Sequence, residues 1–402
     1  MYIPQLRFPT TKNMKTRMRI SLLVCFFIVV FTDGCRQGTF EENVTSTPSL
    51  KEITYPTPRV YPFNQSENFI HLAWFYKPPK EENLPLLVQN FDFFILTHKD
   101  EETRDKLDSI GVDSPIFQYL LLTQIRRPDN CNDGNYGNQV AYKSGDFCLM
   151  MEQHPDWFLL DDTGNPIHND KTYFMDPGNS EYRTFWLQRA REMQMQYKWD
   201  GLFIDNVDAS LSKFERMGKL PKKYPNDTSY QTEIDEFLSY LQKNNETLNG
   251  NLVLGNIISV KDNEIWLKYI NKLDGAMIES FAVDWSSGYK SVSDWEDQMN
   301  KIEMVLNQGK ILILVSQGSQ DNANREQFAL ASYLLVSNGN AAFRYTNSSS
   351  YGEVWLYENF QTNLGSPLGS RYHKGNAWRR DFSNGYVLVD PKLNVSQIVI
   401  TK

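Results

Sequence analysis

The sequence predicts an α/β protein, a (β/α)8 or TIM barrel with a long insertion after strand 3 and a short C-terminal β appendage. Three observations support this fold class. Eight short segments are almost continuously apolar, as expected for parallel strands that are buried on both faces. Most of these segments alternate with segments of helical periodicity. Together they extend over 278 residues, from Phe69 to Thr346, which is close to the roughly 250 residues typical of such a barrel.

The predicted strands are short and are bounded by turn residues or by helical segments. They are residues 68–76, 91–98, 115–124, 201–208, 251–256, 275–281, 311–317 and 341–346. A doubly wound open sheet is the structural alternative, but it needs fewer strands and often has a glycine-rich first turn. Because no Gly-x-Gly-x-x-Gly motif follows any of the segments, the sequence favours the barrel.

Helices are predicted where apolar residues recur every three or four positions. These segments are residues 180–197, 229–243, 293–308 and 325–337. The third has the clearest boundaries. Ser293 and Glu296 have the spacing of a capping box, and Gly309 stands where a helix usually stops.

About 76 residues, 125–200, separate the third and fourth predicted strands, far more than an ordinary connection needs. A long insertion at this point lies at the carboxyl face of a barrel, where active sites are built. The insertion contains Cys131 and Cys148. In a secreted protein this spacing favours a disulfide, and two free buried thiols are the alternative. No Cys-x-x-Cys motif or paired histidines accompany them, so we expect no zinc site and no other metal.

The N-terminal segment predicts export. Basic residues at 12–19 precede an apolar run of 12 residues at 20–31, which matches a secretory signal and is too short to span a bilayer. Gly34-Cys35 follows, as in a lipoprotein signal, so lipidation of Cys35 and simple secretion are both open. An uncleaved N-terminal anchor is a further alternative. We therefore expect the protein to be secreted, periplasmic or held at the cell surface, with any membrane attachment through the N-terminus only.

The predicted organisation has four parts. They are a signal at 1–35, a flexible tether at 36–67 that is rich in Thr, Ser, Pro, Glu and Asn, a catalytic barrel at 68–346, and a β extension at 347–402 packed on the barrel. Two antiparallel strands are predicted in this extension, at 384–390 and 396–400.

Composition excludes several functional classes. The chain has 41 Lys and Arg against 49 Asp and Glu, a net charge of −8, which argues against nucleic acid as a partner. With residues 1–35 removed the balance becomes 36 to 48, or −12, which also disfavours adhesion to an anionic membrane. Four cysteines are too few for a disulfide scaffold, and 13% aromatic residues are too many for a disordered chain.

Two carboxylates stand where predicted strands end. Asp205 ends the fourth strand and Glu279 ends the sixth, and the strand ends of one barrel face a common site. A pair of carboxyl groups is what hydrolysis of a glycosidic bond needs: one protonates the leaving oxygen, and the other attacks the anomeric carbon or activates water. Helix capping is the alternative role for such residues, chiefly for Asp208, and Ca²⁺ binding by residues 205–208 is a weaker alternative.

Other polar and aromatic residues at strand ends or in face loops are expected to bind sugar, since sugars offer hydroxyl groups and apolar faces. These are Trp74, Tyr76, His98, Asn206, Asp208, Asn256, Trp285, Gln317 and Arg344. No Gly-x-Ser-x-Gly or His-Glu-x-x-His motif supports another type of hydrolase, and no cofactor is expected.

Four segments of the chain resemble a known group of enzymes. They are HPDWFLLDDTGNPI (154–167), YFMDPGNSEYRTFWLQ (173–188), WDGLFIDNVD (199–208) and RRDFSNGYVLVDPK (379–392). They resemble the hypothetical glycosyl hydrolase family 15 group and, more distantly, the endo-α-1,4-polygalactosaminidase family. The resemblance covers most of residues 68–392. Asp390 departs from it, because these families have Asn there.

The resemblance implies a (β/α)8 glycoside hydrolase whose catalytic pair is the aspartate of strand four and a glutamate of a later strand. Asp205 corresponds to the first by its motif, and Glu279 to the second by strand position. Asp176 matches a family position at the entry to the helix before strand four, where it would shape the substrate site or cap the helix.

The sequence thus leads to one hypothesis and one alternative. The hypothesis is a secreted or lipid-anchored glycoside hydrolase that cleaves a poly- or oligosaccharide. The alternative is a non-catalytic glycan-binding barrel at a cell surface, which needs no paired carboxylates. A distance above about 10 Å between Asp205 and Glu279 would reject the hypothesis in this form.

Overall fold

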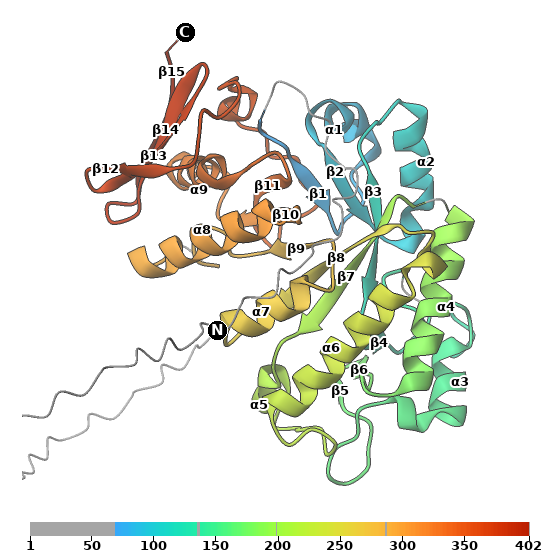
Figure 1. Ribbon diagram of the computed structural model, residues 1–402. Coiled ribbons are helices and arrows are strands. Elements are labelled where there is room, and N and C mark those ends of the chain that lie inside the picture. The colour runs from blue at the N-terminus through green and yellow to red at the C-terminus, as the bar shows by residue number, and fades with distance from the viewer. Residues whose placement is uncertain (1–68, 135–136, 198, 286–287, 402) are drawn as a thin grey trace, which may run out of the picture. The chain divides into compact units, whose positions relative to one another are not determined.

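The structure is a computed structural model that describes residues 69–134, 137–197, 199–285 and 288–401. Its central sheet has eight parallel strands, and each predicted strand is present (Figure 1). In sheet order these are β1 (Ala73–Phe75), β2 (Phe93–Leu96), β3 (Ile116–Leu121), β7 (Gly201–Asp208), β8 (Leu252–Ile258), β9 (Gly275–Ile278), β10 (Ile311–Gln317) and β11 (Ala341–Thr346). A parallel bridge between Leu72 and Phe343 brings the eighth strand back to the first. The predicted barrel is confirmed.

Side chains of the strands form two separate apolar layers. Within the barrel lie alternate strand residues such as Phe75, Ile95, Phe203 and Ile313. The residues between them point outward and pack against the surrounding helices. This alternation is the pattern expected of a barrel whose interior is filled by side chains rather than open.

Helices cover the outside of the barrel (Figure 1). They are α1 (Leu84–Asn90), α2 (Glu101–Ser109), α4 (Ser180–Tyr197), α5 (Ser212–Met217), α6 (Asp227–Lys243), α7 (Asn263–Ile270), α8 (Val292–Asn307) and α9 (Ala323–Val336). Short 3-10 turns occur at η1 (Glu81–Asn83), η2 (His98–Asp100), η3 (Pro155–Trp157), η4 (Asn245–Leu248) and η5 (Glu358–Gln361). Polar caps begin several helices. The Asn226 side chain, for example, accepts a hydrogen bond from the Ser229 amide at the start of α6.

The predicted cap of α8 was wrong by two residues. The helix begins at Val292, and its cap is Ser291, whose hydroxyl accepts a hydrogen bond from the Asp294 amide at 3.1 Å. Ser291 and Ser293 both precede an acidic residue by three positions, so the capping pattern fits either of them. The predicted stop is present, since Gly309 has a φ of 78°, in the left-handed region.

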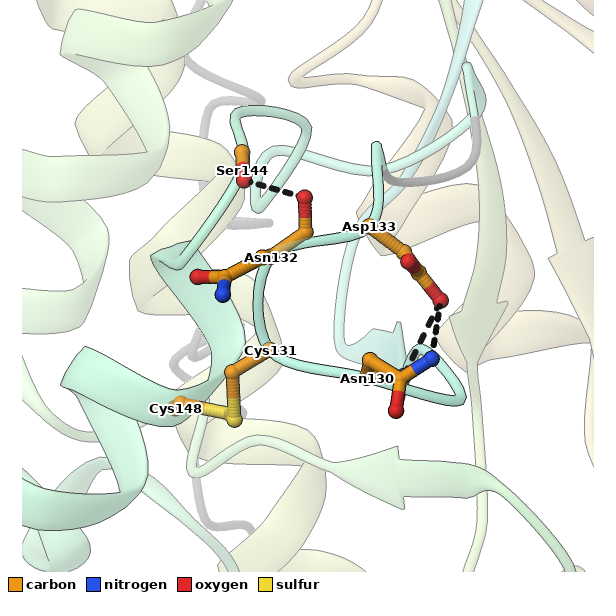
Figure 2. The surroundings of a disulfide bond; sticks show 6 residues. All are labelled: Asn130, Cys131, Asn132, Asp133, Ser144 and Cys148. Carbon is orange, nitrogen blue, oxygen red and sulfur yellow. Dashed lines mark hydrogen bonds between the residues drawn. A yellow bond between two sulfur atoms is a disulfide. The ribbon is translucent and has the colours of Figure 1, made fainter.

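The insertion after β3 is a small ordered unit rather than a plain loop. It contains β4 (Gln124–Arg126), α3 (Asp146–Gln153), β5 (His168–Asn169) and β6 (Thr172–Phe174). The three strands form an antiparallel sheet in the order β4-β6-β5. Figure 2 shows the disulfide that links loop residue Cys131 to Cys148 on α3, with the two Cα atoms 5.7 Å apart. The predicted disulfide is confirmed.

The C-terminal extension forms a four-stranded antiparallel sheet, where two strands were expected. Its strands are β12 (Tyr372–Lys374), β13 (Ala377–Phe382), β14 (Gly385–Asp390) and β15 (Val395–Ile400), in that order (Figure 1). The sheet packs against α9. Buried Arg380 donates hydrogen bonds to the carbonyls of Leu334 and Ser337, and so satisfies acceptors at the end of that helix. The first two strands were missed because β12 is exposed and half of the residues of β13 are polar.

The predicted signal, tether and lipidated Cys35 lie outside the described residues. Within the described part of the chain, no helix combines the length and apolar character needed to cross a membrane.

Candidate active site

Asp205 owes its position to an irregularity in β7. The pairing of β7 with β8 shifts register between Ile204 and Val207, and Asn206 has a left-handed backbone with a φ of 56°. Asparagine tolerates this conformation better than most residues. Phe203 points into the barrel and Val207 packs outside it, so the bulge reverses the alternation directly after Asp205. Asp205 thus ends the inward-facing row at the barrel mouth.

Three neutral donors hold the Asp205 carboxylate. The Tyr119 hydroxyl donates to Oδ2 at 2.5 Å, while the Asn206 amide and Asn256 Nδ2 donate to Oδ1 at 2.8 and 3.0 Å. The residue is only 9% exposed. Burial raises the pKa of Asp205, and the three hydrogen bonds act in the opposite direction by favouring the charged form.

Glu279 follows β9 directly and lies beside Asp205. The same Asn256 nitrogen donates to Glu279 Oε2 at 2.9 Å. Since this nitrogen lies 3.0 Å from Asp205 Oδ1, the two carboxylate oxygens are at most about 5.9 Å apart. Burial raises the pKa of Glu279 to about 6, and the negative charge of Asp205 acts in the same direction. Hydrogen bonds from Asn256, Tyr76 and Tyr351 partly offset these effects.

Three tyrosines surround the two carboxyl groups. The Tyr76 ring lies 5.3 Å from that of Tyr119 and 5.4 Å from that of Tyr351, between ring centroids. Tyr76 has a left-handed φ of 73°, an unusual conformation for a tyrosine and one found mostly at functional sites. Burial and the nearby charges of Asp205 and Glu279 raise the pKa of Tyr76, so its hydroxyl stays protonated and can donate a hydrogen bond.

Arg344 supports the site from within the protein. Its guanidinium donates to the carbonyl of Tyr351 at 2.7 Å and to that of Phe75 at 3.3 Å, and it lies 4.4 Å from the Trp74 ring centroid. Burial lowers the pKa of Arg344 to about 9. Although the sequence predicts Arg344 as a sugar ligand, these contacts direct its charge to the backbone of the Tyr351 loop.

Several predicted site residues do come together. Asn256 joins the two carboxylates, and Asn206 lies half-buried beside Asp205. Gln317, the last inward residue of β10, donates to the Tyr351 hydroxyl at 3.5 Å. Trp285 lies in the loop after β9 and is 50% exposed, so its ring has surface for a ligand.

Other predicted residues lie apart from the carboxylate pair. Trp74 is fully buried and packs against Phe91 on the outside of the barrel, which leaves no ring surface for a sugar. Asp208 is also fully buried and forms an ion pair with Lys213 of α5. The prediction for Asp208 depends on the alternation of a regular strand, and the bulge before Asp208 breaks that alternation.

His98 and Asp176 have local partners. His98 Nδ1 lies 2.6 Å from a Glu101 oxygen, and its ring contacts Tyr142 edge-on. Asp176 accepts hydrogen bonds from the Tyr224 hydroxyl, from Lys223 Nζ at 2.8 Å and from the Gly178 amide at 2.9 Å. These contacts fix the chain before α4.

Sequence reasoning missed Tyr119 and Tyr351. Tyr119 lies in the middle of β3, one inward position below the strand end, so the rule that strand ends face the site does not select it. Tyr351 lies five residues beyond the end of β11, in a loop that no motif marks. In the described ranges, no group of three or more His, Cys, Asp or Glu residues is arranged to hold a metal ion.

An eight-stranded parallel barrel with two adjoining carboxyl groups at its mouth is an arrangement found in TIM-barrel glycoside hydrolases. The model of the family named Hypothetical glycosyl hydrolase family 15 matches residues 115–386. The chain belongs to this family and is a glycoside hydrolase, which confirms the resemblance found in the sequence. No curated protein matches the sequence.

Solved structures with a similar fold include other glycosidases. The glycoside hydrolase domain of PelA from Pseudomonas aeruginosa is 17% identical, with 71% of this chain and 97% of that chain covered and a TM-score of 0.47. The maltogenic α-amylase AmyB from Thermotoga neapolitana is 12% identical, with coverage of 82% and 87% and a TM-score of 0.48. The α-galactosidase TtGalA from Thermus thermophilus is 13% identical, with coverage of 83% and 68% and a TM-score of 0.46. At these scores the similarity supports no conclusion about substrate or mechanism.

Proposed function

We propose that the protein cleaves glycosidic bonds of a poly- or oligosaccharide, with Asp205 and Glu279 as the catalytic pair. The observation that carries this proposal is the shared Asn256 amide, which keeps one oxygen of each carboxyl group within about 5.9 Å of the other. Carboxyl groups in retaining glycosidases lie about 5–5.5 Å apart, whereas inverting enzymes need about 6.5–9.5 Å to admit a water molecule. This upper limit between two oxygens is closer to the retaining separation than to the inverting one, so we propose retention. The geometry also favours catalysis over a non-catalytic glycan-binding barrel, which would not need this pair.

The surroundings of the two carboxyl groups suggest different roles. Asp205 accepts three hydrogen bonds that stabilise its charged form, as a nucleophile requires. Glu279 is more exposed than Asp205, and its pKa of about 6 allows it to carry a proton near neutral pH and exchange it with water.

The reaction then proceeds in two steps. Glu279 gives its proton to the glycosidic oxygen as the bond to the anomeric carbon breaks, while an Asp205 oxygen forms a bond to that carbon. Water next attacks the same carbon and gives a proton to Glu279. The bond to Asp205 breaks, and both carboxyl groups return to their starting states.

Aromatic and amide groups around the pair suit a sugar ring. Tyr76 and Tyr351 border the pair, Trp285 is exposed in the loop after β9, and Gln317 can share hydrogen bonds with hydroxyl groups. Of the predicted ligands, Trp74, Asp208, His98, Asp176 and Arg344 are left out of this substrate site, because their contacts are with the protein.

We also propose that the protein acts outside the cytoplasm. The signal-like segment at 1–35 supports export, with the choice between lipidated Cys35 and simple secretion left to experiment. The disulfide between Cys131 and Cys148 is consistent with an oxidising compartment.

The experiment begins with a panel of soluble polysaccharides and aryl glycosides. For any substrate that is cleaved, proton NMR of the first product reports whether the anomeric configuration is retained. A matching 2-deoxy-2-fluoroglycosyl fluoride should add one sugar to the protein, on the peptide that contains Asp205. Inversion, a label on another carboxylate, or failure to cleave any member of the panel would contradict the proposal.

A further inference from the structure

The insertion after β3 lines most of a cavity whose lining includes neither Asp205 nor Glu279. Its volume is about 730 Å³, within the range of small-molecule sites. None of its lining residues belongs to a barrel strand.

The floor of this cavity is aromatic and apolar. Phe147 and Tyr173 lie with ring centroids 5.0 Å apart, and the His168 ring stacks on Tyr173 at 4.9 Å. Met151 and Pro166 complete the floor and are half-buried. Flat rings beside aliphatic groups match the apolar faces of a pyranose.

The rim of the cavity is polar and carries both signs of charge. Arg127 and Lys219 contribute positive charge, and the three carboxylates of Asp129, Glu152 and Asp161 contribute negative charge. A rim with donors and acceptors but little net charge suits hydroxyl groups and gives no attraction to a polyanion. This balance favours a glycan without carboxylate or sulfate groups.

The wall of the cavity is fixed before any ligand arrives. The disulfide ties Cys131 to α3, and the adjoining turn is held by hydrogen bonds from the Asn130 amide and side chain to Asp133 and from Ser144 to the Asn132 carbonyl (Figure 2). On the opposite rim, Asp161 Oδ1 accepts hydrogen bonds from the amides of Thr163 and Asn165. A preformed wall lowers the entropy cost of binding.

The cavity is also within reach of a substrate chain that occupies the barrel mouth. Eight residues lead from Tyr119, which contacts Asp205, to Arg127 on the cavity rim. Even a fully extended chain of that length spans less than about 30 Å. A polysaccharide chain is long enough to span this distance.

We propose that this cavity is a second carbohydrate-binding site, which holds a non-acidic oligosaccharide stretch of the substrate outside the catalytic site. The proposal rests on the glycosidase function proposed above. Contact at a second point raises the affinity for long chains through effective concentration, and it leaves short substrates unaffected.

The test compares two neighbouring exposed positions of α3. Glu152 lines the cavity and Gln153 does not. Glu152→Trp should fill the cavity, and Gln153→Trp is the matched control. Both are made in an Asp205→Asn background, which prevents cleavage, and are run by affinity electrophoresis through gels containing soluble starch, laminarin, galactomannan or polygalacturonate. We expect at least one of the three neutral polymers to retard the parent and the control, with retardation about fivefold weaker for Glu152→Trp.

A milder pair keeps the test valid if the tryptophan disturbs folding. Arg127→Ala removes a rim donor, and Arg126→Ala changes an exposed neighbour that does not line the cavity. We expect about threefold weaker retardation for Arg127→Ala only. In the active enzyme, Glu152→Trp should leave kcat on an aryl glycoside unchanged while raising KM for the polymer.

The outcomes separate the two proposals. Equal retardation of each variant and its control, or no retardation in any neutral gel, would overturn the second site. If polygalacturonate retards the parent and Glu152→Trp abolishes this retardation, the assignment of a non-acidic glycan as the ligand would be overturned. Retardation that depends on Glu152, in a protein whose wild type cleaves nothing, would support the cavity and count against the glycosidase function.

Discussion

The mouth of the barrel and the layer between β7 and its helices each hold a buried aspartate from the same strand. Burial raises the pKa of both Asp205 and Asp208. Their partners differ, however. Neutral hydroxyl and amide groups hold Asp205, whereas the ammonium group of Lys213 pairs with Asp208. Neutral donors orient a carboxylate and leave its charge available for chemistry, while an ion pair cancels the charge. The partners, rather than burial or a shifted pKa, distinguish the proposed reactive residue from the structural one.

The largest effect should come from Asp205→Asn. An amide cannot form the bond to the anomeric carbon, so we expect kcat to fall at least about 10³-fold. The melting temperature should not fall, because the substitution replaces a buried charged group with a neutral amide of similar shape. Exposed Asp162→Asn is the control and should keep full activity. Activity that survives Asp205→Asn would remove this residue from the catalytic pair.

Glu279→Gln should come next, with kcat reduced about 10²- to 10⁴-fold because the leaving oxygen is no longer protonated. Added azide should restore turnover of an activated aryl glycoside by Glu279→Ala. Such a leaving group departs without a proton, and the azide anion can then attack the anomeric carbon and break its bond to Asp205 without help from a base. If azide has no effect and the variant is folded, the acid/base assignment is wrong.

The wild-type pH profile tests the same residue. Glu279 acts as an acid while protonated, so kcat/KM should fall as pH rises through about 6. Its pKa is raised from the ordinary value of about 4.5, so the folded state binds the proton more tightly than the unfolded state. Stability should therefore decline by up to about 2 kcal/mol as pH rises from about 4.5 to 6. The Glu279→Gln variant should lack this part of the decline in stability. If urea unfolding shows the same dependence of the free energy of unfolding on pH for both proteins, the raised pKa of Glu279 would be contradicted.

Asp208→Asn should lower stability and leave activity nearly unchanged, which is the reverse of the effect expected for Asp205→Asn. The substitution leaves the mostly buried Lys213 ammonium without its ion pair, so we expect a loss of about 3 kcal/mol in the free energy of unfolding. Well below the melting temperature, kcat should stay close to wild type. A large loss of activity with unchanged stability would place Asp208 in the catalytic site and break the contrast with Asp205.

The smallest effect should come from Tyr351→Phe. The Tyr351 hydroxyl hydrogen bonds to Glu279 and lowers the pKa of that carboxyl, so its removal should move the alkaline limb of the activity profile to higher pH. Tyr357→Phe, which removes a hydroxyl bonded to the Gln320 carbonyl, is the control and should not shift the profile. A shift to lower pH in Tyr351→Phe would contradict the proposed contact.

Much of the fold could be predicted from the sequence, because buried parallel strands are continuously apolar and apolar residues recur periodically along one face of a helix. The eight barrel strands and the helix at 180–197 agree with the sequence interpretation. The start of α8 did not, because two serines fit the same capping pattern. The strands β12 and β13 were missed, since β12 is exposed and β13 is half polar, so neither forms a continuous apolar run.

The catalytic candidates were found for a topological reason: strands of one barrel end at one face. That rule gave Asp205, Glu279 and Asn256, which share hydrogen bonds. It did not give side-chain direction. Trp74 points outward from β1, and Arg344, although it points into the barrel, is occupied by the carbonyls of Phe75 and Tyr351. Tyr351 comes from a loop whose path depends on these tertiary contacts and not on local pattern.

The arrangement around α9 has a practical consequence for anyone who shortens this protein. Residues 325–336 of this helix are buried with little interruption, and the C-terminal sheet packs against it. A gene truncated after β11, at the apparent end of the barrel, would uncover the apolar surface of α9 and remove the Arg380 hydrogen bonds at its end. We expect such a product to aggregate during expression, so a soluble minimal version has to keep the chain through β15.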